Sequence, residues 1–522
     1  MLPEQHPSAR PRIASRSGGA PPPLTNPLAA FPSGQAVLGA LALLCATVAN
    51  YALLARHDPS PEIVSLCGVL LSLALLLPPM LDSLATGLRS LVKPQYIFTF
   101  GLIYWLLLEL IQQLYELSLP GYDIFAGFLA IALFALAVLF GASGDSNIVS
   151  RWSRRLAQAH LSLNHTFFAT VACFILALTY YLFRSGWSFE ALLSEALRGR
   201  GMLPWSRGAY GDTWAALEGL TYFSYIIPTL LILQIRISRT PLSPQILISA
   251  ALAFSSLMLI AADGSRRTVG AAIISALVCW FLTADRGHPS LKTFLVAICL
   301  VLVVLLSLNL LLQTRGNWTR GLKIDAASYS AARVDDNFLR LCQTIEAVPT
   351  HAPYSGFSPV VFALVRPIPR VLWPGKPSGP GFTLHDYLGF RGVSLSISTV
   401  GELYTCFGFA SVLAGGWLFG RLCRYWSKLL RYQGTLPVIG VYCAGYGTLF
   451  VGIRSTIDLA MLAYPLGAAW IVFRVIPRRK LRPTTPILHW HSAHHAHRPL
   501  TPVSSYPNRP AHMPRFFASC CC

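Results

Sequence analysis

Residues 36–55 read AVLGALALLCATVANYALLA, twenty consecutive residues without a charged side chain. An α-helix of this length rises about 30 Å, which matches the thickness of the hydrocarbon core of a bilayer. The segment is too long, and begins too far from residue 1, to be the apolar region of a cleaved secretory signal. It therefore predicts a membrane-spanning helix.

Segments of the same kind recur along the whole chain. Apolar residues make up 54% of the 522 residues and charged residues only 12%, against about 25% charged residues in soluble domains. Because the apolar runs are long and do not alternate as in a β-barrel, we predict an all-α, polytopic integral membrane protein with about 12 transmembrane helices. The expected spans are 36–55, 62–80, 95–115, 122–141, 165–183, 214–234, 245–263, 268–283, 293–313, 398–420, 436–453 and 457–474.

The predicted spans divide the chain into three regions. Residues 1–35 are rich in Pro, Ser and Gly and are expected to be a disordered cytoplasmic tail. Residues 36–475 are expected to form the transmembrane domain, in which the seventh and eighth spans read as a tight re-entrant pair. Residues 476–522 are expected to form a cytoplasmic, His-rich tail that is either simply solvated or able to bind a metal ion. Most of the 12 cysteines lie in apolar segments and no CxxC pair occurs, so we predict neither a structural metal site nor a cofactor.

The positive charges set the expected orientation. The net charge of +20 resides mainly between apolar segments, where the positive-inside rule accounts for it, so nucleic acid is excluded as a partner. Short loops rich in Lys and Arg alternate with short loops that are poor in them. This pattern predicts that both termini are cytoplasmic. The two long loops, 184–213 and 314–397, are then outside, the larger one before the last three spans.

The larger loop ends in a stiff cationic run, in which arginine, tryptophan and lysine are set among prolines and glycines between residues 366 and 381. Two further arginines follow Gly264 and Ser265 in a tight outer turn. Guanidinium groups bind phosphate oxygens in bidentate fashion, which favours an anionic substrate at the outer face; the alternative is that these loop cations are merely solvated. The residues predicted to bind substrate are Arg266, Arg267, Arg366, Arg370, Trp373 and Lys376.

Two groups are candidates for a catalytic base. Glu402 lies just inside a predicted span, where an ionisable group is a functional candidate, and its alternative role is an ion pair with a loop arginine. His385 is the second candidate, because imidazole is the most common general base in enzymes, and its alternative role is structural. Trp373 fits either an interfacial aromatic belt or a platform for a sugar ring. Arg454 and Asp458 are expected to form a structural pair at the outer end of the last two helices.

Three short segments carry a family resemblance. The run Arg366-Pro-Ile-Pro-Arg370-Val-Leu-Trp373-Pro-Gly-Lys376-Pro, the segment Gly401-Glu402-Leu-Tyr404-Thr-Cys-Phe407-Gly408 and the turn Gly264-Ser265-Arg266-Arg267 resemble the oligosaccharide repeat-unit polymerases, the Wzy-type O-antigen polymerases of bacterial envelopes, and the related O-antigen ligases. The arrangement of many spans with one large outer loop before the last few is similar as well.

The resemblance implies a metal-independent glycosyltransferase of the bacterial inner membrane. It would polymerise undecaprenyl-diphosphate-linked oligosaccharide repeat units at the periplasmic face for O-antigen, capsule or exopolysaccharide synthesis. It further implies contact with membrane lipid, a chain-length regulator and a flippase as partners, diphosphate held by the cations named above, and Glu402 or His385 as the base. The alternatives are an O-antigen-type ligase and a transporter or flippase of lipid-linked oligosaccharides.

Overall fold

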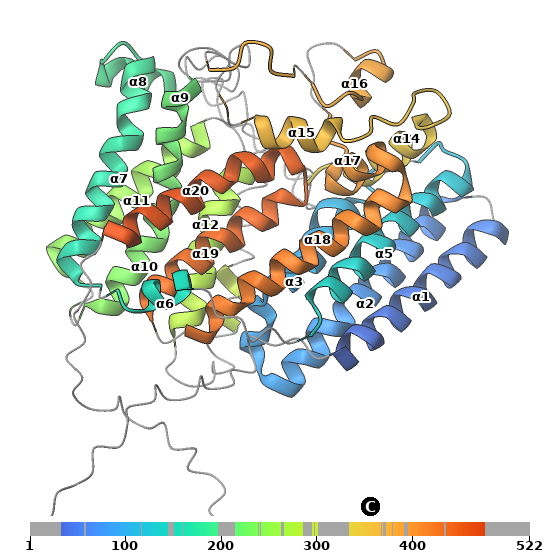
Figure 1. Ribbon diagram of the computed structural model, residues 1–522, viewed down its shortest axis with the longest axis horizontal. Coiled ribbons are helices and arrows are strands. Elements are labelled where there is room, and N and C mark those ends of the chain that lie inside the picture. Colours follow the sequence, from blue (N-terminus) through green and yellow to red (C-terminus); the bar gives the residue numbers. More distant parts are fainter. Residues whose placement is uncertain are drawn as a thin grey trace, which may run out of the picture. The chain divides into compact units, whose positions relative to one another are not determined.

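The computed structural model describes residues between 33 and 475 with internal gaps (Figure 1). The two predicted tails, apart from residues 33–35, lie outside the described residues, as do most of the predicted span 293–313 and parts of both long loops. The described ranges are 33–56, 59–115, 117–144, 151–159, 161–196, 215–238, 240, 242–262, 266–284, 295–296, 298–300, 334–366, 368, 372–377, 379–390, 395–432 and 435–475.

Within these ranges the regular structure is helical throughout, and eight helical segments are long and apolar enough to cross a membrane. This confirms the predicted all-helical fold with several membrane-spanning helices, whereas the total of about 12 spans stays a prediction. The eight segments are α1 (Ser33–Arg56), α2 (Pro61–Thr86), the run formed by α3 (Pro94–Leu102), the π-helical turn η3 (Ile103–Leu107) and α4 (Leu108–Ile111), α5 (Gly121–Ala142), α7 (Leu163–Arg184), the run formed by the 3₁₀ helix η4 (Gly219–Ile226) and α10 (Ile227–Ile237), α11 (Pro244–Ala262) and α12 (Arg266–Ala284).

The remaining elements include the last helices of the bundle and several short helices at its ends. They are η2 (Leu88–Val92), α6 (Arg151–Ala157), α8 (Phe189–Ala196), α9 (Ala215–Glu218), α14 (Asn337–Ala347), α15 (Ser358–Val365), α16 (Leu384–Tyr387), α17 (Ser398–Phe407), α18 (Phe409–Ser427), η6 (Lys428–Tyr432), α19 (Leu436–Gly452) and α20 (Thr456–Val475).

The predicted spans and the structure differ in detail at two places. The expected span 398–420 is two helices, α17 and α18, broken at Gly408, whose φ of +68° is open to glycine but strained for other residues. The seventh and eighth spans, expected as a tight re-entrant pair, are the helices α11 and α12 of 19 residues each, and each contains a segment long and apolar enough to cross a membrane.

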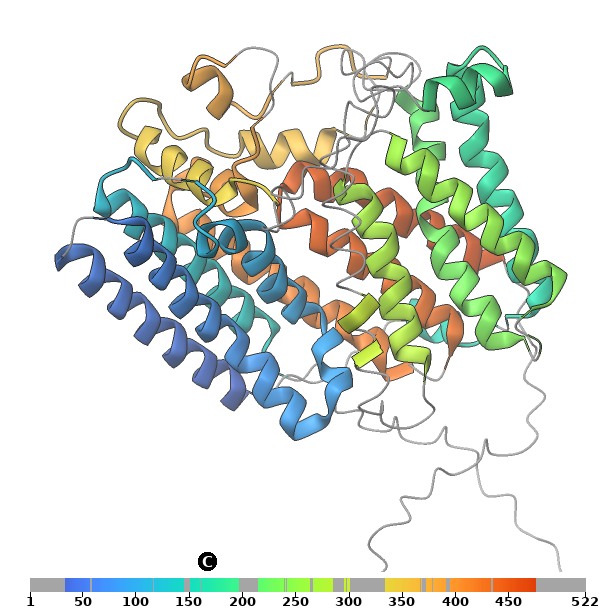
Figure 2. The ribbon, with the colours of Figure 1, turned by 180° about the vertical axis from the view of Figure 1, so that it is seen from behind.

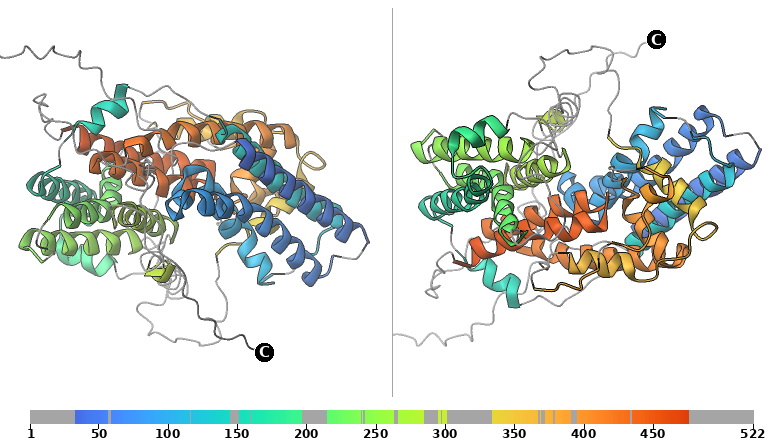
Figure 3. Two further views of the ribbon diagram at one scale, coloured as in Figure 1. Left: turned by 90° about the horizontal axis from the view of Figure 1, so that it is seen from below. Right: turned by 90° about the horizontal axis from the view of Figure 1, so that it is seen from above.

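Helix α19 lies at the centre of the bundle. It is buried along almost its whole length and contacts α20, α12, α10 and α3. Glycines permit this close packing: a Cβ added at Gly447 would lie 2.4 Å from the carbonyl oxygen of Ala271 in α12, and one at Gly445 would meet the Trp426 ring. Together with α20, α19 separates α7, α10 and α11 on one side from α1, α2 and α5 on the other (Figures 2 and 3).

The second close pairing joins α5 and α18, which contact each other along much of their length. Gly416 and Gly420, four residues apart on α18, face α5, and an added Cβ would lie 2.7 Å from the Phe134 oxygen and 2.3 Å from the Val138 oxygen, respectively. This small-residue spacing brings two backbones together, as in many helix pairs within membranes.

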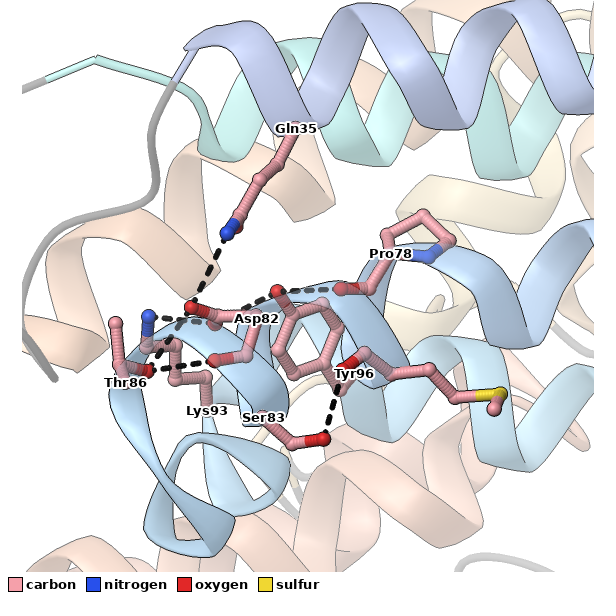
Figure 4. Close-up of polar contacts among 8 residues, drawn as sticks. Gln35, Pro78, Asp82, Ser83, Thr86, Lys93 and Tyr96 are labelled. Atoms are coloured by element: carbon pink, nitrogen blue, oxygen red, sulfur yellow. Dashed lines mark hydrogen bonds and ion pairs between the residues drawn. The ribbon is translucent and has the colours of Figure 1, made fainter. Parts of the chain in front are cut away.

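A buried ion pair fixes the turn between α2 and α3 (Figure 4). The Lys93 ammonium lies 2.6 Å from Asp82 Oδ2, and both side chains are at most 1% exposed. Asp82 also accepts hydrogen bonds from the Tyr96 hydroxyl at 2.8 Å, from Thr86 Oγ1 at 3.1 Å and, at 3.4 Å, from Gln35 of α1. Burial lowers the pKa of Lys93, and the adjacent Asp82 carboxylate partly offsets this effect.

Candidate functional site

The short helices α8, α14, α15 and α16 lie at one end of the bundle, which we call the loop end (Figure 1). Helix α15 contacts α17 and α20, and α14 contacts α5 and α17. The described part of the larger loop therefore packs on the last helices of the chain. The predicted site residues that fall within the described ranges are found on these elements and on α12.

Glu402 lies in α17, where its carboxylate binds Ser455, just before α20, and Thr456, the first residue of α20. Ser455 Oγ donates to Glu402 Oε1 at 2.5 Å, and the backbone N–H of Thr456 donates to Oε2 at 2.7 Å. The N-terminal turn of a helix has unsatisfied N–H groups and a positive partial charge, both of which a carboxylate stabilises. Both oxygens of Glu402 thus hold the start of α20.

The first turn of α17 is tied to the same short connection between α19 and α20. The Thr399 N–H donates to the Ile453 oxygen at 3.0 Å and its hydroxyl donates to the Gly452 oxygen. Ser398 is fully buried with a φ of +64°, and its hydroxyl accepts from the Gly401 N–H at 3.3 Å. A non-glycine residue in the left-handed region is uncommon, and such residues cluster at functional sites.

The beginning of the described loop is anchored by two carboxylates. Arg454 Nε lies 2.8 Å from Asp335 Oδ2, so Arg454 pairs with the loop, while the side chain of Asp458, its expected partner, lies outside the description. Glu109 in α4 accepts a hydrogen bond from the Val334 N–H. These contacts join a spanning helix, the loop and the connection between α19 and α20.

The π-helical turn η3 supplies a further anchor for the loop. The Trp105 carbonyl oxygen in this turn accepts from Asn337 Nδ2 at 3.1 Å, and Trp105 Nε1 donates to the Phe450 oxygen of α19 at 3.0 Å. Both Asn337 and Cys342 of α14 are fully buried. Burial raises the pKa of the Cys342 thiol well above its usual range, an effect to which the nearby Asp123 carboxylate adds.

The cationic run lies at the end of α15 and forms a closed turn. Lys376 Nζ donates to the carbonyl oxygens of Arg366 and Ile368, at 2.7 and 2.8 Å. The Arg366 guanidinium lies over the Phe362 ring, 5.6 Å from its centre. Trp373, which follows in the run, is exposed. Lys376 therefore shapes the turn through backbone contacts, while Arg370 lies outside the described residues.

His385 lies on α16, which contacts α14. Its Nε2 is 3.6 Å from Asp386 Oδ1, and the imidazole is partly exposed. The Asp386 carboxylate also accepts a hydrogen bond from the Thr383 hydroxyl. At 3.6 Å the imidazole and the Asp386 carboxylate are neighbours without a hydrogen bond between them.

The turn arginines begin α12. The side chain of Arg266 lies outside the description, and Arg267 is half-buried. One turn further along, Ala271 packs beside Val451 near the end of α19. The structure thus brings Arg267, Glu402 and the Arg366 turn to elements that pack on the α19–α20 hairpin. It leaves His385 on a separate helix.

Several residues at this site were not predicted from the sequence. Ser455 and Thr456 bind the Glu402 carboxylate, and Asp335 binds Arg454. The sequence signal for Ser455 and Thr456 is that they follow Arg454 in a short polar connection between two apolar segments. In the described part of the chain, no group of three or more His, Cys, Asp or Glu side chains is placed to hold a metal ion.

Comparisons with known proteins identify no relative. No family model matches the chain, and neither a curated protein nor a solved structure does. The fold by itself defines the class of the protein, a multi-pass helical membrane protein.

Proposed function

We propose that the protein is a membrane glycosyltransferase that joins undecaprenyl-diphosphate-linked oligosaccharide repeat units at the outer face of the bacterial inner membrane. The observation that carries the proposal is the loop end itself. A charged residue, Glu402, lies there within an otherwise apolar helix, and the Arg366 turn and Arg267 belong to elements that pack on the same hairpin as Glu402. A carboxylate and guanidinium groups at the end of a hydrophobic bundle suit a substrate that is part lipid and part anion.

The reaction consists of three events that the protein has to assist. The hydroxyl of the acceptor sugar attacks the anomeric carbon of the donor, the bond from that carbon to the diphosphate oxygen breaks, and the hydroxyl proton passes to a base. In this proposal Arg266, Arg267, Arg366 and Arg370 stabilise the negative charge of the departing undecaprenyl diphosphate. Trp373, which is exposed, offers a ring face to a sugar.

His385 is the better candidate for the base. Both oxygens of Glu402 already accept hydrogen bonds, from Ser455 and from the backbone of Thr456, so an acceptor hydroxyl would have to displace one of these donors. The His385 ring is partly exposed and has Asp386 beside it. We therefore assign Glu402 the role of positioning the start of α20, and His385 the proton transfer.

The test is the polysaccharide made by cells that lack the gene. If the protein is a polymerase, these cells should lack the long polysaccharide chains that form a ladder on a gel, while single repeat units should still be transferred to the surface. In complemented cells we expect His385→Ala and Arg370→Ala to shorten the chains and Asp386→Asn to shorten them less. Chains of normal length from both alanine variants, at normal protein abundance, would remove the assigned roles.

A second function, transport of lipid-linked oligosaccharides, is favoured by one observation. Transporters place interrupted helices around their substrate, and the span at 398–427 is broken at Gly408 while that at 219–237 begins with eight residues of 3₁₀ helix. If the protein is a transporter, the same gene deletion should make lipid-linked repeat units accumulate at the inner face of the membrane. A ligase predicts full-length polymer that stays attached to its lipid carrier.

A further inference from the structure

Helix α15 has one apolar face that no other described element covers. Phe357, which precedes the helix, is 69% exposed and Leu364 is 70% exposed, and Val361 between them is exposed as well. Their spacing of four and three residues places them on one side of the helix. On the opposite side Pro359, Phe362 and Ala363 are buried, towards α17 and α20.

This exposed face is continuous with a surface that the bilayer covers. The Phe357 ring meets the exposed Phe407 ring at the end of α17, with centres 4.9 Å apart. Beyond Gly408, α18 exposes Leu413 and Trp417. Because α18 packs along the spanning helix α5, its exposed apolar side faces lipid. The apolar strip therefore runs from hydrocarbon-facing α18 on to α15.

A second short helix at the loop end has the same character. In α8, Phe189 and Leu193 are exposed, four residues apart, together with Trp187 just before the helix. Leu192 turns inward and packs in a cluster with Tyr180 and Tyr181 of α7. Figure 1 shows α8 and α15 at the same end of the bundle, so both helices are placed to meet the same leaflet.

The charges around α15 fit the headgroup level of that leaflet. Arg366 ends the helix on the side away from the apolar face, and its guanidinium rests on the Phe362 ring. Helices that lie in a membrane interface combine an apolar face with cations on the polar side, where lipid phosphates are bound.

We propose that α15 is an interfacial helix that lies along the membrane surface at the loop end, with Phe357, Val361 and Leu364 inserted among the acyl chains of one leaflet. Helix α8 enters the same leaflet through Phe189 and Leu193. The bilayer surface then passes at the level of α15. This places the Arg366 turn next to lipid phosphates, whichever reaction the protein performs.

A photoreactive diazirine amino acid placed at single positions tests this in proteoliposomes that contain only the purified protein and phospholipid. Position 364 should form lipid adducts within about threefold of those at position 413 on α18, which serves as the lipid-facing control. Position 386, where the Asp386 side chain is 75% exposed on the polar α16, should form at least about tenfold fewer. Position 193 reports on α8 in the same way.

Three results would overturn the proposal. One is a yield of lipid adducts at position 364 as low as at position 386, while position 413 reacts normally. Another is a protein–protein adduct at position 364 in place of lipid, which would assign the face to a second copy of this chain. The third is a lipid yield at position 386 equal to that at position 413, which would mean that α15 does not mark the membrane surface.

Discussion

Replacing Asp82 by asparagine tests the buried ion pair between α2 and α3. At the observed separation of 2.6 Å, two unit charges attract each other by about 6 kcal/mol for an effective dielectric constant of about 20. The attraction offsets the cost of burying both groups, so loss of one partner leaves an uncompensated charge and costs about 3–5 kcal/mol. The asparagine keeps the shape of the side chain and can still accept from Tyr96. The decrease in the free energy of unfolding therefore reports the loss of the negative charge alone.

The pH dependence of this loss follows from the fate of Lys93. Burial already lowers the pKa of this ammonium group, and without Asp82 it is expected to lose its proton in the folded state. Deprotonating a lysine of ordinary pKa at pH 7 costs about 5 kcal/mol, which sets an upper limit to the penalty. Since the unfolded chain then binds one more proton than the folded chain, stability of the variant rises by about 1.4 kcal/mol per pH unit. The penalty at pH 9 should thus be about 2 kcal/mol.

Unfolding free energies of the purified protein in mixed micelles, titrated with a denaturing detergent at pH 7, 8 and 9, measure this directly. The double variant Asp82→Asn, Lys93→Met carries neither charge, so it should be less destabilised than Asp82→Asn at pH 7 and show no added pH slope. The partly exposed pair Asp336–Arg340 is the matched control, where Asp336→Asn should cost at most about 0.5 kcal/mol. A loss below about 1 kcal/mol for Asp82→Asn at pH 7, or a loss independent of pH, would refute the reasoning.

Two further predictions concern packing. Gly420→Leu should destabilise the protein by about 3 kcal/mol or more, because even its Cβ would lie 2.3 Å from the Val138 oxygen. The control in the same unfolding assay is Gly467→Leu, where a Cβ meets nothing within 4 Å. Equal stabilities of the two variants would contradict the close pairing of α5 and α18. Asn337→Ala removes the hydrogen bond to the π-helical turn, so transient release of α14 should raise the alkylation rate of the buried Cys342 thiol about five- to tenfold. Mass spectrometry measures this rate, and an unchanged rate would show that the bond does not hold α14 in place.

Hydropathy predicted the spanning helices because the signal is local. The expected span 122–141 and helix α5 (Gly121–Ala142) differ by one residue at each end, and the expected span 165–183 lies within α7. Each such helix satisfies its own backbone hydrogen bonds, so its length and position depend on its own residues. The break at Gly408 was not predicted, although glycine weakens helices, since the apolar run continues on both sides.

The polar contacts could not be predicted, because they join residues far apart in the sequence. Glu402 is conspicuous as a charge in an apolar segment, but its partners Ser455 and Thr456 lie more than 50 residues away. In the sequence, Lys93 is one cation among several in the short loops between apolar segments. Its burial against Asp82 depends on how the turn folds back on α2, which the sequence pattern does not reveal.

The departures from regular α-helix occur where other elements meet the α19–α20 hairpin. The π-helical turn η3 holds Trp105, whose ring nitrogen bonds α19, while the 3₁₀ helix η4 and the broken helix α17 both contact α20. In a bilayer, irregular backbone is stable only where protein or water satisfies its polar groups, and π-turns and long 3₁₀ segments are frequent at functional sites. The α5–α18 pair, by contrast, consists of two regular α-helices that pack closely through Gly416 and Gly420. Changes of activity without loss of fold are therefore expected from substitutions around the hairpin, rather than from the α5–α18 pair.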